Sequence, residues 1–110
     1  MKTTKENLEI IFANMKANKW YPEYDEMLWG YFFIDRDKTK LIKFSILLEK
    51  QGYHIVEIWQ DDESLYWLSI ERVEKHSIDS LLERNIDLEK FAISNEIDCY
   101  DGWDVEKILR

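Results

Sequence analysis

The sequence predicts an α+β fold: a ferredoxin-like βαββαβ sandwich, in which an antiparallel sheet carries both helices on one face, plus an extra N-terminal helix. Helical and strand patterns follow one another along the chain in the order that this layout requires. Hydrophobic residues make up 45% of the 110 residues and aromatic residues 15%, which is typical of a chain that buries a core. Only three Gly and one Pro occur, so we expect long regular elements joined by short turns.

The N-terminal segment has the pattern of an amphipathic helix. Its apolar residues recur at spacings of three and four over residues 4–18, as Leu8, Ile11, Phe12 and Met15. Residues 20–25, which include Pro22, break this pattern and are expected to form a connector that could act as a hinge. We therefore expect residues 1–26 to be a helix and connector, and residues 27–110 to be the ferredoxin-like domain.

The first half of that domain is predicted to be a strand followed by a helix. Residues 27–34 are rich in strand-forming residues and apolar on both faces, which predicts a central strand. Asp35 or Asp37 is suited to cap the helix that follows, which runs to Gln51. Gly52 then stands where a glycine commonly ends a helix.

The second half is predicted to contain a hairpin, a helical region and a last short strand. Residues 53–60 and 65–73 are strand-like, and the polar residues 61–64 separate them as a turn. Ser77 is suited to cap the helical region, whose apolar period slips at residues 85–87, so a kink or two short helices are expected there. Residues 97–100 are predicted to form the last strand, followed by a turn at residues 101–102 and a helical turn over residues 105–109.

The charge of the chain limits its partners. The net charge is −8 and the pI is about 4.7, which disfavours direct binding to nucleic acids or anionic membranes and favours a basic protein. Cys99 is the single cysteine and cannot form an internal disulfide, so we expect a reducing compartment. No segment has the roughly 20 apolar residues of a membrane-spanning helix, and the N-terminus lacks an apolar signal core. We expect a cytoplasmic protein.

The residues that catalysis or metal binding requires are scarce. His54 and His76, the two histidines, have no ligand partner at metal-binding spacing. Cys99 stands in a predicted strand, where we expect it to be a small buried residue. The sequence alone still allows a catalytic triad in which Cys99 meets one of the histidines in space. Three isolated glycines cannot build a phosphate-binding loop. We expect no catalytic residue, no cofactor and no metal, and therefore not an enzyme.

The acidic residues are unevenly distributed and point to a binding surface. Residues 51–71 contain no Lys or Arg, the C-terminal segment is acidic, and Lys38, Lys40 and Lys43 gather on the first helix of the domain. This segregation indicates either a docking surface for a basic protein or a solvated hairpin that resists aggregation. The candidate partner-binding residues combine these acids with neighbouring aromatics: Glu57, Trp59, Asp61, Asp62, Glu63, Trp67, Asp98, Tyr100, Asp101, Trp103 and Asp104.

The string Tyr100-Asp101-Gly102-Trp103 resembles the signature that closes the RraB domain, a family of protein regulators of ribonuclease E. The resemblance covers about residues 27–106 and includes the apolar strand at Tyr31, the Gly52-Tyr53 pair and the aromatic strand at Trp67. Three departures are that the chain stops at Arg110 without a long acidic tail, that Asp104 follows the signature where some members have Gly, and that the helix before Met27 is not a defining part of the family's domain. The signature is either a structural clasp for the C-terminal strand, with Gly102 in a positive-φ turn, or a contact surface.

The resemblance implies a non-catalytic protein-binding module that inhibits or modulates a ribonuclease. An immunity protein that neutralises a toxin such as a nuclease fits the same size and charge, and a small ligand-binding or enzymatic domain is a third alternative. The partner is expected to be a basic nuclease or nuclease toxin, and the oligomeric state is left open.

Overall fold

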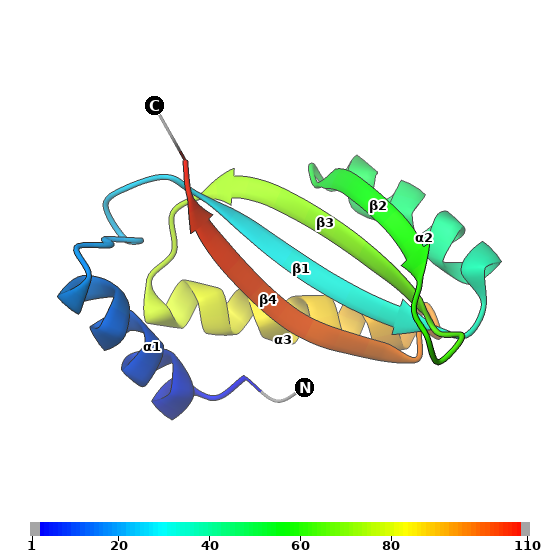
Figure 1. Cartoon of the computed structure of the whole chain (residues 1–110), viewed down its shortest axis with the longest axis horizontal. Coiled ribbons are helices and arrows are strands. Elements are labelled where there is room, and N and C mark those ends of the chain that lie inside the picture. Colours follow the sequence, from blue (N-terminus) through cyan, green and yellow to red (C-terminus); the bar gives the residue numbers. More distant parts are fainter. Residues whose placement is uncertain (1–2, 109–110) are drawn as a thin grey trace.

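A computed structural model describes residues 3–108 of the chain and shows an α+β fold with a four-stranded antiparallel sheet and three helices (Figure 1). The elements in chain order are α1 (Lys5–Ala17), β1 (Met27–Asp35), α2 (Lys38–Lys50), β2 (His54–Gln60), β3 (Tyr66–Glu74), α3 (Ile78–Ser94) and β4 (Cys99–Lys107).

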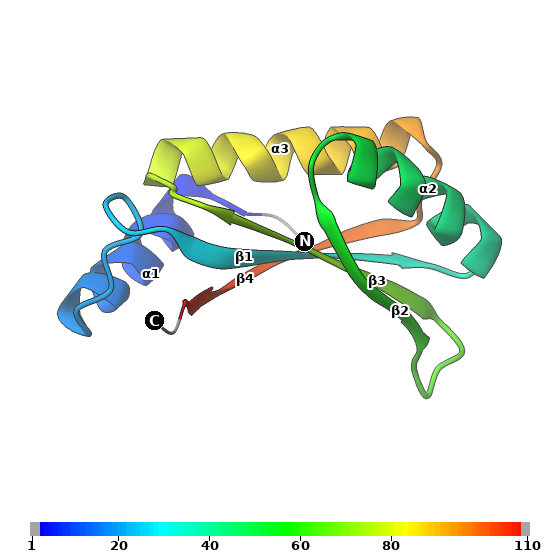
Figure 2. The same ribbon diagram turned by 90° about the horizontal axis from the view of Figure 1, so that it is seen from above.

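The strands lie in the order β2-β3-β1-β4, and every neighbouring pair is antiparallel. β1 is therefore a central strand, as its apolar sequence predicts. Helices α2 and α3 lie on one face of this sheet, while α1 lies beside one end of α3 (Figure 2). The predicted hairpin is confirmed as β2 and β3.

The helix boundaries follow from local capping. The side chains of Thr4, Asp37 and Ser77 each accept a backbone N–H in the first turn of α1, α2 and α3, which satisfies donors that a helix leaves unpaired. Gly52 has φ of +96° just after the end of α2, the left-handed conformation that glycine adopts without strain. The predicted caps at Asp37, Ser77 and Gly52 are confirmed.

The hydrophobic core lies between the sheet and the helices. Alternate residues of β1, namely Trp29, Tyr31 and Phe33, are fully buried and belong to this core. Phe33 meets Phe44 of α2 edge to face, with ring centroids 5.0 Å apart, a favoured aromatic geometry. Helix α1 adds three buried side chains to the same core: Leu8, Phe12 and Met15. The division of the chain at residue 26 stays a prediction.

The predicted kink in the last helix is wrong, because α3 is continuous from Ile78 to Ser94. The apolar period slips where Asn85 occupies a buried position. Its Nδ2 donates to the carbonyl of Leu81, and its Oδ1 accepts from the hydroxyl of Tyr100. A buried polar side chain with satisfied hydrogen bonds therefore interrupts the sequence pattern without interrupting the helix.

The predicted end of the chain is also wrong. Instead of a short strand, a turn and a helical turn, β4 is one strand that pairs with β1 from Cys99 to Lys107. A bulge interrupts the register opposite Phe32 and Phe33, and there Gly102 has φ of +113°. The positive φ that the signature predicts is confirmed, but it serves a bulge inside the strand. Leu109, in the predicted helical turn, lies outside the described residues.

Within residues 3–108, no helix is both long enough and apolar enough to cross a membrane.

Candidate partner-binding surface

The sheet has one face that no described helix covers, which we call the open face. Successive strand residues point to opposite sides, so the residues that alternate with the buried ones lie on this face. In β1 these are Leu28, Phe32 and Ile34, which are partly exposed, together with Gly30. Figure 1 looks onto the open face, with α2 and α3 behind the strands.

Strand register arranges the open face in rows that run across the sheet. The first row, nearest the hairpin loop, is Trp59, Trp67, Ile34 and Cys99. The second is Glu57, Ser69, Phe32 and Gly102, the third is His54, Glu71, Gly30 and Asp104, and the fourth is Val73, Leu28 and Glu106. Aromatic and aliphatic side chains therefore share this surface with carboxylates, which stand in the second, third and fourth rows.

Two tryptophans form the aromatic corner of the open face. The rings of Trp59 and Trp67 are nearly parallel, with centroids 5.7 Å apart and an interplanar angle of 15°. The Trp67 indole N–H donates to Asp61 in the hairpin loop at 2.8 Å. Asp61 also accepts from the backbone N–H groups of Glu63 and Leu65. These hydrogen bonds, that of the indole first, lower the pKa of Asp61 and fix one of the two rings.

The charge of the open face is acidic. Its strand positions carry Glu57, Glu71, Asp104 and Glu106, and no Lys or Arg stands at any described strand position on it. Burial, and then repulsion by Glu106, raise the pKa of Asp104, although a hydrogen bond from the Gly30 backbone lowers it. The carboxylate of Asp104 lies over Gly30, where an added Cβ would stand 2.3 Å from its Oδ1.

The remaining acidic candidates lie at the hairpin end of the sheet. Asp62 and Glu63 are exposed in the loop between β2 and β3. Asp98, just before β4, accepts from the backbone N–H of Arg36 and forms an ion pair with its side chain at 3.2 Å. These contacts, the backbone hydrogen bond first, lower the pKa of Asp98. Asp98 is therefore engaged within the chain.

The aromatic residues of the signature lie on the opposite side of the sheet. Tyr100 is buried, and Trp103 packs against the core with its ring 5.7 Å from that of Trp29. Asp101 is the extra residue of the β4 bulge. The structure thus brings Glu57, Trp59, Trp67 and Asp104 onto one face, with Asp61, Asp62 and Glu63 beside it, and directs Tyr100 and Trp103 toward the helices.

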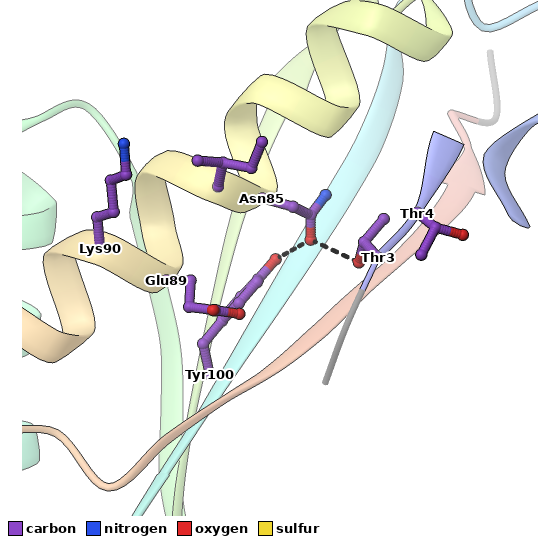
Figure 3. Close-up of a pocket in the computed structure, with 7 residues that line it drawn as sticks. Thr3, Thr4, Asn85, Glu89, Lys90 and Tyr100 are labelled. Atoms are coloured by element: carbon purple, nitrogen blue, oxygen red, sulfur yellow. Dashed lines mark hydrogen bonds between the residues drawn. The ribbon is translucent and has the colours of Figure 1, made fainter. Parts of the chain in front are cut away.

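A pocket of about 290 Å³ lies where Tyr100 meets α3 and the start of the described chain (Figure 3). Three of its polar side chains are joined by hydrogen bonds. The Tyr100 hydroxyl donates to Asn85 Oδ1 at 2.5 Å, and the Thr3 hydroxyl donates to the same oxygen at 3.5 Å. At this pocket, internal hydrogen bonds therefore join β4, α3 and the residue before the N-cap of α1.

Ionisable side chains also meet beneath the sheet, around Glu74. Its carboxylate accepts from Tyr31 at 2.9 Å and from Arg84 at 2.6 Å, and lies 3.0 Å from His76 Nε2. Burial opposes the charge of Glu74, but the hydrogen bond of His76 and the positive charge of Arg84 lower its pKa to about 2. His76 is buried, and both of its ring nitrogens have hydrogen-bond partners within the chain. No three metal-binding side chains cluster within residues 3–108.

Several open-face residues were missed from sequence. They are Leu28, Phe32, Ile34, Glu71, Val73 and Glu106. In β4 the sequence does carry a signal for a shared face, because the acidic residues Asp104 and Glu106 are two residues apart, which is the period of a strand. β1 gave no such signal, because its apolar residues on both faces favour a strand covered on both sides.

Comparison with known proteins identifies the family. The sequence profile of the RraB family, described as regulator of ribonuclease activity B, matches residues 5–105. The match begins at Lys5 and therefore includes α1, contrary to the expectation that this helix is not a defining part of the family's domain. A search of curated proteins found no match. The chain belongs to the RraB family.

Proposed function

We propose that this chain regulates a ribonuclease as a non-catalytic inhibitor or modulator that binds the enzyme through the open face. Membership of a family of regulators of ribonuclease activity supports the target class. Ribonuclease E is the specific target that we propose. The observation that supports the surface is the acidic and aromatic open face, which lies opposite the helices.

The composition of the open face suits a basic protein. Aromatic side chains such as Trp59 and Trp67 provide apolar contact area, and tryptophan is enriched at binding hot spots. The carboxylates around them attract a basic surface and raise its association rate. Enzymes that bind RNA carry such surfaces, because phosphate contacts draw on Lys and Arg.

Other features go with this proposal. The antiparallel order β2-β3-β1-β4 supports a ferredoxin-like domain. A net charge of −8 supports the absence of direct nucleic-acid binding, and a single cysteine supports a cytoplasmic site of action. Neither the fold nor the family match favours the immunity-protein alternative or a nuclease toxin as the partner.

The test is calorimetric titration of purified ribonuclease E with this protein, together with an RNA cleavage assay. The open-face variant combines Glu57→Lys with Glu71→Lys, and the control combines Glu49→Lys with Glu83→Lys on exposed positions of α2 and α3. Each substitution adds two positive charges, so both variants change the net charge from −8 to −4.

We expect the open-face variant to bind at least about tenfold more weakly and to lose its effect on cleavage, because each reversed charge faces the partner. The control should bind within about threefold of the wild type, since salt screens charges beyond about 8 Å. Absence of wild-type binding would refute the proposed target, and equal losses in both variants would refute the proposed surface.

A further inference from the structure

We propose that the corner formed by Trp59 and Trp67 binds arginine side chains of the partner, which stack on the indole rings and pair with the carboxylates around them. This inference rests on the proposed function, because it names the chemistry of the partner segment that the open face would take. Its occupant is a protein segment that carries arginine.

The first support is the placement of the two rings. Both tryptophans are partly exposed, and neither belongs to the hydrophobic core or packs against it. They stand side by side on β2 and β3, with nearly parallel rings 5.7 Å apart. Such a pair offers π surface to a cation that approaches from solvent.

The second support is that the corner is partly preorganised. The hydrogen bond of 2.8 Å from Trp67 Nε1 to Asp61 fixes the orientation of one indole. Asp61 is itself held by two backbone N–H groups of the loop. Because Trp67 is already ordered before binding, less binding free energy is lost to fixing its side chain when a partner stacks on the pair.

The third support is the charge around the rings. Residues 51–71 contain five carboxylates and no Lys or Arg. Glu57 lies two residues before Trp59 on the same face of β2, and Asp62 and Glu63 are exposed in the adjoining loop. Carboxylates beside an aromatic surface complement a guanidinium group, because that group can stack on a ring and pair with a carboxylate at the same time.

These features select arginine over lysine. A guanidinium group is planar and weakly hydrated, and it stacks on aromatic rings while its N–H groups reach carboxylates. A lysine ammonium is a compact, strongly hydrated charge that gains less from the same corner. The affinity of the corner should therefore depend on the kind of cation as well as on the number of charges.

The experiment uses two labelled probe peptides of equal length and charge. One carries four arginines separated by Gly-Ser, and the other carries four lysines in the same positions. Binding to the full chain is measured by fluorescence anisotropy at about 0.15 M salt. We expect the arginine peptide to bind at least about fivefold more tightly, because stacking adds to the charge attraction.

Two variants separate stacking from charge. Trp59→Leu should abolish the preference for arginine and change the affinity for the lysine peptide by less than about twofold. Glu57→Gln should weaken both peptides by a similar factor. The matched control is Tyr24→Leu, since Tyr24 is an exposed aromatic residue outside the open face, and it should change neither affinity. If Trp59→Leu does not fold, Trp59→Phe should reduce the preference.

Equal affinities of the wild type for the two peptides would overturn the inference. A preference for arginine that persists in Trp59→Leu would also overturn it. If Trp59→Leu does not fold, an undiminished preference in Trp59→Phe would do the same. A second copy of this chain on the corner would also overturn it, and light scattering would then show a dimer that Trp59→Leu dissociates. Titration of ribonuclease E separates the two proposals. If the wild type and Trp59→Leu bind ribonuclease E equally well, the proposed arginine site at the corner is refuted and the proposed function stands. If the arginine peptide is preferred but ribonuclease E does not bind, the proposed function is refuted and the arginine site stands.

Discussion

The hydroxyl of Tyr100 donates a hydrogen bond of 2.5 Å to Oδ1 of Asn85, and this bond joins β4 to α3 beneath the sheet. Both side chains are buried. The tyrosine that opens the Tyr-Asp-Gly-Trp string is therefore anchored to the helix on the covered face. This geometry favours the structural role of that tyrosine over a contact with a partner.

Removing this hydrogen bond should destabilise the protein. We expect Tyr100→Phe to lower the free energy of unfolding by about 1–2 kcal/mol, because a buried acceptor loses a donor. Asn85→Leu should cost at least as much, and the double variant less than the sum of the two. Urea denaturation of the four proteins measures the coupling. If the losses of the two single variants simply add up in the double variant, the two side chains are not coupled and the hydrogen bond does not contribute as described.

The bulge in β4 predicts a second effect. Gly102 has φ of +113°, a conformation that residues with a Cβ rarely adopt. Gly102→Ala should lower the free energy of unfolding by about 1–2 kcal/mol without changing the fold, as judged by circular dichroism. A variant as stable as the wild type would show that the signature glycine is not required by backbone conformation.

The cluster around Glu74 predicts the response to acid. The pKa of Glu74 is lowered to about 2 from an ordinary value of 4.5, since His76 and Arg84 outweigh the effect of burial. A lowered pKa in the folded state contributes stability above the unfolded value, and this contribution is lost as the pH falls from about 4.5 to 2. We expect this loss to be roughly 2 kcal/mol.

The matched variants for this effect are Glu74→Gln and Glu49→Gln, the second at an exposed position of α2. Urea midpoints measured between pH 2 and pH 7 should show a shallower acid decline for Glu74→Gln than for the wild type. Glu49→Gln should follow the wild type. If stability falls with acid as steeply in Glu74→Gln as in the wild type, protonation of Glu74 does not cause the loss of stability.

Helix α1 is expected to unfold together with the sheet. Leu8 is fully buried in the same core cluster as Leu88 of α3. Leu8→Ala should lower the free energy of unfolding by about 2–4 kcal/mol, similar to Leu88→Ala, because both leave a cavity. Thermal unfolding followed by circular dichroism checks this. If Leu8→Ala left the main transition unchanged, α1 would be an independent element.

Much of the fold could be predicted from sequence because its signals are local. Asp37, Ser77 and Gly52 mark helix ends through short-range hydrogen bonds and backbone conformation. The two errors arise from long-range contacts. Asn85 resembles a break in a helix until Tyr100 pairs with it, and residues 101–107 resemble a turn and a helix until they pair with β1.

The candidate surface was predicted only in part for the same reason. Glu57, Trp59 and Trp67 are close in sequence, so the predicted hairpin already groups them. Phe32 and Asp104 join them only through the order and register of the strands. Composition cannot reveal which face of a sheet the helices cover, and this choice decides that Trp103 lies inside while Trp67 lies outside.

The most direct test of the central claim is hydroxyl-radical footprinting of this protein, alone and in complex with ribonuclease E. Binding through the open face predicts that oxidation of Trp59, Trp67 and Phe32 falls at least about threefold in the complex, because a bound partner excludes solvent from their rings. Tyr24, which is 75% exposed in the connector before β1, should be oxidised equally in both samples. Protection of Tyr24 with unchanged oxidation of Trp59 and Trp67 would contradict the account.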